Sequence, residues 1–190
     1  MADQTARRLT FMAHLVASFP NKDASLRIGK AMVDGGAQLL EVQFPFSDPT
    51  ADGIYIQRAC AEALEGGFTV DDGFQIVKQL KALTEPPVIF VMVYANLAFR
   101  PGIEMFLSRC RDAGADGVIV PDLPPDYDEG LYASGRKYGL EVVPVVPVTA
   151  QAERLREVVE TSQARYLYTA LRKGVTGGYT QISEDSVSFL

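Results

Sequence analysis

The chain has 190 residues, of which 47% are hydrophobic, and it carries a formal net charge of −6 at pH 7 with a pI near 4.8. This length and hydrophobic share suit one domain with a substantial core and exclude an intrinsically disordered chain. The acidic balance, without any run of Lys or Arg, argues against nucleic acid or an anionic membrane surface as a partner.

The cysteines and the histidine argue against a metal site or a disulfide framework. Cys60 and Cys110 lack the CxxC or Cys/His spacing of a zinc site, and two small core cysteines fit a reducing cytosol. The single histidine, His14, has no neighbouring His or Cys that would complete a transition-metal site. The longest apolar run, residues 86–93, is far shorter than the ~18–20 residues of a membrane span. We therefore expect a cytoplasmic protein without a metal ion.

The first predicted elements are a strand and a well-delimited helix. Residues 9–18 show little alternation of apolar and polar side chains, which predicts a strand covered on both faces. Residues 24–33 carry apolar side chains at helical spacing, with Asn21 or Asp23 as the N-cap. Gly35 and Gly36 then predict the end of this helix, because glycine readily adopts the left-handed conformation of a C-cap.

Strands and helices are predicted to alternate along the rest of the chain. The strongest β-propensity lies in residues 87–94, PVIFVMVY. The further predicted strands are residues 39–43, 117–120, 141–146 and 166–170, and the further helices are residues 54–64, 70–83, 103–113, 127–138 and 150–160.

This alternation is typical of βαβ units in a parallel sheet. Residues 34–41 are echoed by residues 112–122, each a helix end, a small-residue turn, an apolar strand and an acid, at the spacing of two βα units. The pattern predicts an α/β fold of the (β/α)8 TIM-barrel type, with about six of its eight units, as a single incomplete domain over residues 1–190. A doubly wound sheet is the alternative, but residues 19–21 lack its Gly-rich phosphate loop.

Acidic side chains follow several predicted strands, where barrel enzymes place their reacting groups. Glu41 ends the second strand, Asp52 lies in the next loop, and Asp122 ends the fourth strand. Two carboxylates in different surroundings can divide acid and base roles, and the apolar neighbours of Glu41 favour a raised pKa. From the spacing alone a second interpretation stays open, in which Asp48 and Asp52 only form turns.

Two other features carry a functional and a structural interpretation. His14 lies in the first strand, where its side chain could face the barrel mouth, and a lone histidine there fits a satisfied or ligand-packing residue better than a base. Residues 172–178, RKGVTGG, combine two cations with glycines and a hydroxyl, which suits a lid over an anionic substrate or a flexible surface turn.

The loop after the second strand resembles a known family signature. Glu41, the Pro-Phe-Ser-Asp-Pro of residues 45–49, the Ala-Asp-Gly of residues 51–53 and Ile56-Gln57 are similar to the tryptophan synthase alpha subunit. Matching pieces follow in the same order over nearly the whole chain, at residues 94–97, 117–124, 166–168 and 174–177.

The resemblance implies a lyase that cleaves indole-3-glycerol phosphate into indole and glyceraldehyde 3-phosphate in tryptophan biosynthesis, without a cofactor of its own. It implies that Glu41 shuttles protons and that Asp52 accepts the ring N–H. The substrate would contact the side chains or backbone of Tyr168, Tyr94, Met92, Ile119, His14, Thr176 and Gly177.

The resemblance also implies a partner. Asp48 and Pro45, together with Thr176, match positions that couple loop closure to a tryptophan synthase beta subunit in an alpha2beta2 complex. Pyridoxal phosphate is expected only in that partner.

Some residues depart from the family pattern. The family usually has a glycine where Gln43 stands and Phe or Tyr where His14 stands, and it has Thr and Gly-Asp-Pro where this chain has Val16 and residues 18–20. Gln43 either crowds the substrate site or faces the helices. In this family, contacts to the substrate phosphate come mainly from the loops after strands seven and eight. In this chain only Gly177 matches such a contact. The alternatives are a non-catalytic subunit that activates a beta subunit, or another phosphate-sugar barrel enzyme, although the latter lacks a Schiff-base Lys at a strand end.

Overall fold

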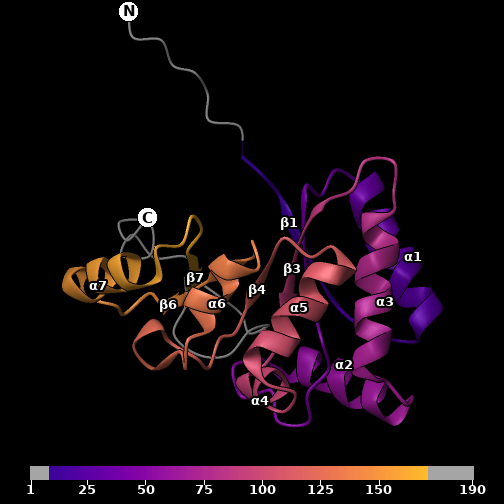
Figure 1. Cartoon of the computed structure of the whole chain (residues 1–190). Coiled ribbons are helices and arrows are strands. Elements are labelled where there is room, and N and C mark those ends of the chain that lie inside the picture. Colours follow the sequence, from indigo (N-terminus) through magenta and orange to yellow (C-terminus); the bar gives the residue numbers. More distant parts are fainter. Residues whose placement is uncertain (1–8, 171–190) are drawn as a thin grey trace, which may run out of the picture.

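The computed structural model describes residues 9–170, in which parallel strands alternate with helices (Figure 1). The strands are β1 (Met12–Val16), β2 (Leu39–Gln43), β3 (Val88–Met92), β4 (Gly117–Ile119), β5 (Glu141–Val143), β6 (Val145–Pro147) and β7 (Tyr168–Ala170). The helices are α1 (Lys22–Asp34), α2 (Ile54–Glu65), α3 (Val70–Lys81), α4 (Ala95–Phe99), α5 (Ile103–Ala113), the 3₁₀ turn η1 (Pro125–Tyr127), α6 (Leu131–Lys137) and α7 (Ala152–Ser162).

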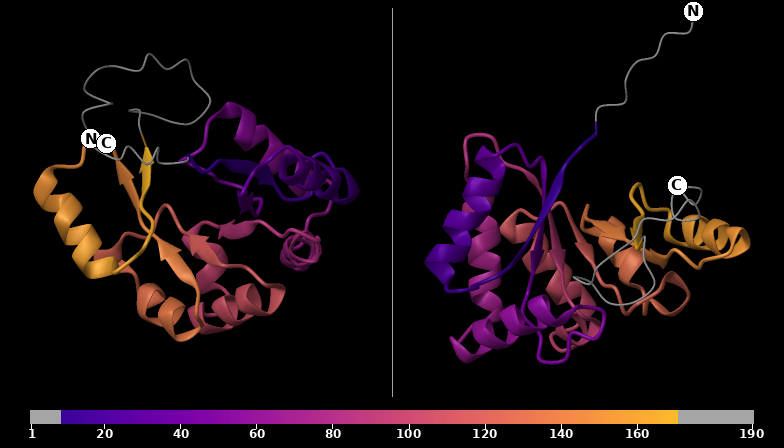
Figure 2. Two further views of the ribbon diagram at one scale, coloured as in Figure 1. Left: turned by 90° about the horizontal axis from the view of Figure 1, so that it is seen from above. Right: turned by 180° about the vertical axis from the view of Figure 1, so that it is seen from behind.

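The strands are neighbours in the order in which they occur along the chain. β1 to β5 form one parallel sheet, and β6 pairs with β7 in a second. Only Pro144 separates β5 from β6, and its carbonyl accepts a hydrogen bond from Tyr168 N at 3.0 Å, which continues the strand order. The helices lie on the outer side of this curved arrangement (Figure 2). A sequential parallel order with helical crossovers is that of a (β/α) barrel, so the predicted fold class is confirmed.

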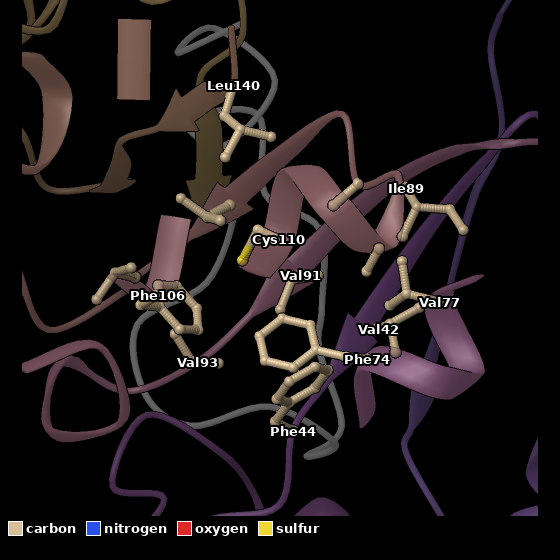
Figure 3. Close-up of a cluster of buried hydrophobic side chains, with 14 of the residues drawn as sticks. Val42, Phe44, Phe74, Val77, Ile89, Val91, Val93, Phe106, Cys110 and Leu140 are labelled. Carbon is tan, nitrogen blue, oxygen red and sulfur yellow. The ribbon is translucent and has the colours of Figure 1, made fainter. Parts of the chain in front are cut away.

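Alternating side chains divide the buried residues into two layers. On the helix side, Val42 and Phe44 of the β2 segment pack with Val91 of β3 and Phe74 of α3 (Figure 3). On the opposite side, Phe90 and the other concave-facing residues form a separate cluster. A strand buried on both faces reads as a near-continuous apolar run, which is why residues 39–43 and 87–94 were predictable. The polar residues Glu41 and Gln43 of β2 share the concave side, because Leu40, Val42 and Phe44 occupy the helix side.

The predicted N-cap of the first helix is confirmed, and a second capping motif was not predicted. Asn21 is the N-cap of α1, and its side chain accepts a hydrogen bond from Ala24 N at 2.9 Å. Thr69 and Asp72 form a reciprocal capping box at α3. At the end of α1, Gly36 takes the positive φ of 99°, whereas Gly35 stays at −77°.

Two predicted elements are each interrupted in the structure. The helix predicted over residues 127–138 is interrupted, because Glu129 and Gly130 take positive φ values of 49° and 83°. The Asp128 carboxylate accepts hydrogen bonds from Gly130 N and Tyr132 N there, which favours a turn before α6. The strand predicted over residues 141–146 is divided at Pro144, which has no N–H for a ladder. The short helix α4 was not predicted.

Candidate active site

Three polar side chains lie together on the concave side of β1 and β2. His14 of β1 pairs in register with Glu41 of β2, and Gln43 lies two residues further along the same strand. Glu41 is 6% exposed and Gln43 is 1% exposed. The sheet register therefore brings residues 29 positions apart, His14 and Gln43, into contact.

Asp52 lies in the loop between β2 and α2 and is held by several hydrogen bonds. Its Oδ2 accepts from Gln43 Nε2 at 2.7 Å and from the Tyr94 hydroxyl at 3.0 Å. Its backbone carbonyl accepts from Gln57 Nε2 at 2.7 Å, and its backbone N–H donates to Pro49 O at 3.0 Å. Two side-chain donors on one carboxylate oxygen, with two backbone contacts beside them, hold the Asp52 side chain in one orientation.

Glu41 has a different environment. Burial raises the pKa of the Glu41 carboxyl, because the charged form loses its hydration, and the nearby negative charge of Asp52 adds to this effect. His14 and a hydrogen bond from Tyr168 act in the opposite direction. A buried carboxyl with a raised pKa can hold a proton closer to neutral pH and release it, as a general acid and base must.

The tyrosines beside the two acids stay protonated. Burial, followed by the charges of Glu41 and Asp52, raises the pKa of Tyr168 to about 12. Burial and the charge of Asp52 also raise the pKa of Tyr94. Both hydroxyls are therefore hydrogen-bond donors to the carboxylates at neutral pH.

An apolar surface faces these polar groups. The predicted site residues Met92, Tyr94 and Ile119 belong to one buried cluster with Phe90 and Val143, and Tyr168 and Phe46 pack against it. The rings of Phe46 and Tyr94 stack with centroids 5.1 Å apart. Strand ends from β3, β4 and β7 thus supply a surface for a planar apolar group.

Gln43 lies on the same side of β2 as Glu41, opposite Val42 and Phe44. Besides Asp52 it contacts His14, with 2.8 Å between Gln43 Oε1 and His14 Nε2, and Cys60 Sγ of α2 at 3.8 Å. Sequence reasoning left this orientation open, although the alternation of Leu40, Val42 and Phe44 contained the signal. The contact of Gln57 with the Asp52 carbonyl and the stacking of Phe46 were missed, and only the closeness of both residues to Asp52 in the chain could have indicated them.

Other predicted residues lie away from this cluster or outside the described part of the chain. Asp48 is exposed and accepts a hydrogen bond from Ser47 Oγ at 2.6 Å, whereas Pro45 is buried. Asp122 accepts from Ala95 N at 2.9 Å at the start of α4, which gives it a structural role. Thr176, Gly177 and the rest of residues 172–178 lie outside the described residues.

Within residues 9–170, no group of three or more His, Cys, Asp and Glu side chains is arranged to hold a metal ion. Over the same range, no helix is long and apolar enough to cross a membrane.

The chain is similar to proteins of one family. The family model described as tryptophan synthase alpha chain matches residues 1–190. A tryptophan synthase alpha chain from Opitutus terrae is 38% identical over 174 residues, which are 92% of this chain and 65% of that protein. One from Methanoregula boonei is 38% identical over 180 residues, 95% of this chain and 67% of that protein. The chain thus spans about two thirds of the length of these curated relatives.

Solved structures agree with the sequence comparison. Tryptophan synthase from Mycobacterium tuberculosis matches with a TM-score of 0.86 and 32% identity, over 96% of this chain and 70% of that chain. The tryptophan synthase subunit alpha of Legionella pneumophila matches with a TM-score of 0.80 and 32% identity, over 86% of this chain and 62% of that chain. The chain belongs to the tryptophan synthase alpha chain family.

Proposed function

We propose that the protein acts in tryptophan biosynthesis as a carbon–carbon lyase, which cleaves indole-3-glycerol phosphate to indole and glyceraldehyde 3-phosphate. The observation that carries this proposal is the pair of buried carboxylates, Glu41 and Asp52, in contrasting surroundings on the concave side of the sheet. Family membership supports the role in tryptophan biosynthesis.

Glu41 is proposed as the group that moves protons. Its raised pKa allows it to deliver a proton to the ring carbon that carries the side chain. The carboxylate that results then takes the proton of the side-chain hydroxyl, as the carbon–carbon bond breaks and that hydroxyl becomes the aldehyde oxygen. The proton that Glu41 gave up is thereby replaced, so the residue ends the cycle in its starting state.

Asp52 is proposed as the acceptor for the ring N–H, where positive charge develops once the ring carbon is protonated. A carboxylate already held in place by Gln43 and Tyr94 stabilises that charge without reorganising. Tyr168, through its hydrogen bond to Glu41, orients the proton-shuttling group. Met92, Ile119 and Tyr94 would pack against the indole ring, with His14, Thr176 and Gly177 as further contacts.

A tryptophan synthase beta subunit, in an alpha2beta2 complex, is the proposed partner. One similar solved structure is described as a tryptophan synthase complex, from Pyrococcus furiosus. The exposed turn at Asp48, next to the buried Pro45, is the proposed contact that couples the two subunits. Pyridoxal phosphate would belong to the partner, and both proteins would act in the cytoplasm.

The test is indole release by the full-length protein with and without Glu41→Gln. Positioned proton transfer contributes typically about 10²–10⁴-fold to rate, so the variant should lose at least two orders of magnitude in kcat. Glu85→Gln, at an exposed position between α3 and β3, is the matched control and should retain wild-type turnover. Turnover retained by Glu41→Gln would contradict the assignment. A protein that raises the activity of a beta subunit but releases no indole would be a non-catalytic activator.

A further inference from the structure

Two polar side chains on neighbouring strands contact each other on the concave side of the sheet. The His14 Nε2 and Gln43 Oε1 atoms are 2.8 Å apart. The other end of the same Gln43 amide reaches Asp52 Oδ2 at 2.7 Å. The amide of Gln43 therefore connects His14 to the proposed acceptor of the ring N–H.

The direction of every hydrogen bond in this chain is fixed by Asp52. The Tyr94 hydroxyl accepts from Ala51 N at 3.0 Å and so turns its proton toward Asp52 Oδ2. With a second donor, Gln43 Nε2, on the same oxygen, Asp52 acts purely as an acceptor. The Gln43 carbonyl oxygen must then face His14, and His14 Nε2 must carry the proton that it donates.

We propose that His14, Gln43 and Asp52 form one hydrogen-bonded unit that orients the Asp52 carboxylate, with His14 and Gln43 as positioning residues. Both ends of the Gln43 amide are engaged, by His14 and by Asp52, so Gln43 acts through Asp52. Among the described residues Oδ2 is the oxygen held by Gln43 and Tyr94, and Oδ1 is assigned to the ring N–H. This inference deepens the proposed lyase function and rests on it.

The hydrogen bond between His14 and Gln43 makes the effects of substitutions at these two residues interdependent. His14→Phe alone would leave the buried Gln43 carbonyl without its donor, and Gln43→Gly alone would leave the His14 N–H and Asp52 Oδ2 each short of one partner. A buried polar group that loses its partner is costly, whereas removing both partners is much less so. The two substitutions should therefore compensate each other.

The kinetic test is a double-mutant cycle on indole release by the full-length protein. His14→Phe and Gln43→Gly should each lower kcat about 10-fold or more, with a smaller change in KM, since each disturbs a hydrogen bond to or near a charged group. The double variant should recover at least about 10-fold relative to the product of the two single effects. Independent effects that simply multiply would overturn the proposal.

Gln43→Met, which keeps an unbranched side chain but removes the amide, separates orientation from space filling. The variant loses both the donor to Asp52 Oδ2 and the acceptor for His14, so it should lower kcat about as much as Gln43→Gly does, with a smaller change in KM. Gln79→Met, at an exposed position of α3, is the matched control and should keep the wild-type kcat. A wild-type kcat for Gln43→Met would count against the unit.

A spectroscopic test does not depend on turnover. Nitrogen-15 NMR of the imidazole of His14, assigned by the loss of its signals in His14→Phe, should show a protonated Nε2 and a bare Nδ1 at pH 8. In Gln43→Met the Nε2 proton should exchange with water faster, because its acceptor is gone. The Nδ1–H tautomer in the wild type would overturn the inference. A protein with the expected spectrum but no indole release would instead contradict the proposed function alone.

Discussion

The hydroxyl of Tyr94 donates a hydrogen bond to the carboxylate of Asp52 over 3.0 Å, and it joins the end of β3 to the loop that follows β2. The same hydroxyl accepts from Ala51 N at 3.0 Å, so it binds two polar groups of one loop. Because Tyr94 is itself buried and stacked on Phe46, this contact fixes the position of Asp52 relative to the sheet.

Tyr94→Phe should therefore destabilise the protein while preserving its packing. The ring stays in place, but Ala51 N loses its acceptor and Asp52 Oδ2 loses one of its two donors. A hydrogen bond to a charged group contributes about 1.5–3 kcal/mol, so the free energy of unfolding in urea should fall by about that amount. Tyr127→Phe, where the side chain is 73% exposed, is the control and should change it by less than about 0.5 kcal/mol. Equal effects of the two substitutions would show that the Tyr94 hydroxyl is not a stabilising contact.

Glu41 should make stability depend on pH. Its pKa in the folded protein is raised above the ordinary value of 4.5, so the folded state keeps this proton at pH values where the unfolded chain has released it. Stability is therefore lost as the pH rises from about 4.5 to the raised pKa. Glu41→Gln removes this loss. The difference in free energy of unfolding, variant minus wild type, should increase over that interval and then stay constant. Glu85→Gln, at an exposed position, should give a difference that does not change with pH.

The sequence predicts most where local and tertiary signals agree. Residues 39–43 and 103–113 begin and end where they were predicted, because an apolar run or helical periodicity is bounded there by turn residues. The strand over residues 141–146 was predicted whole, but Pro144 divides it where its first half pairs with β4 and its second half with β7. Pro144 itself was a local signal for a break, because proline has no N–H for a ladder. The change of pairing partner depends on neighbouring strands, which no local pattern contains.

The site shows the same limit. Glu41, Asp52 and the apolar residues around them could be named from the loop signature, and the register confirms that Met92 and Ile119 lie side by side on β3 and β4. The contact between His14 and Gln43 was out of reach, because it depends on how β1 and β2 align. Two residues that each looked like an isolated departure form one hydrogen-bonded pair only in three dimensions.

The capping box at α3 should respond to acid. Asp72 accepts hydrogen bonds from Lys22 and from Thr69, and these contacts lower its pKa from 3.8 to about 2. A depressed carboxyl pKa gives stability above the unfolded pKa that is lost as the pH falls toward 2. Asp72→Asn should therefore be destabilising by about 1 kcal/mol at pH 7 and by less at pH 2, as measured by urea unfolding at both values. Asp71→Asn, in the same turn, removes only an exposed ion pair with Arg109, in which the Asp71 side chain is 75% exposed, so it should change stability less at either pH.

Gly73 of α3 should not tolerate even a methyl group. A Cβ at this position would lie 2.6 Å from the ring of Phe44, which follows β2 directly and leads into the loop of Asp52. Alanine gains about 1 kcal/mol over glycine in helix propensity, but forcing an atom into a packed core costs about 1–3 kcal/mol or more. At this separation the steric cost should dominate, so Gly73→Ala should lower the free energy of unfolding in urea.

The steric origin of that loss can be isolated with Phe44→Leu, which shortens the side chain facing Gly73. In this background the added methyl group has room, so the cost of Gly73→Ala should shrink by at least about 1 kcal/mol and can become a gain. Gly66→Ala, at the C-cap of α2, is a comparison without a side-chain clash, because its Cβ would meet only backbone carbonyls of that helix, the nearest at 3.3 Å. If Gly73→Ala cost the same in both backgrounds, the contact between α3 and the Phe44 ring would not be what limits this position. A loss that occurs only when residue 44 is Phe would show that the packing of Phe44, which leads into the loop of Asp52, depends on the absence of a side chain at residue 73.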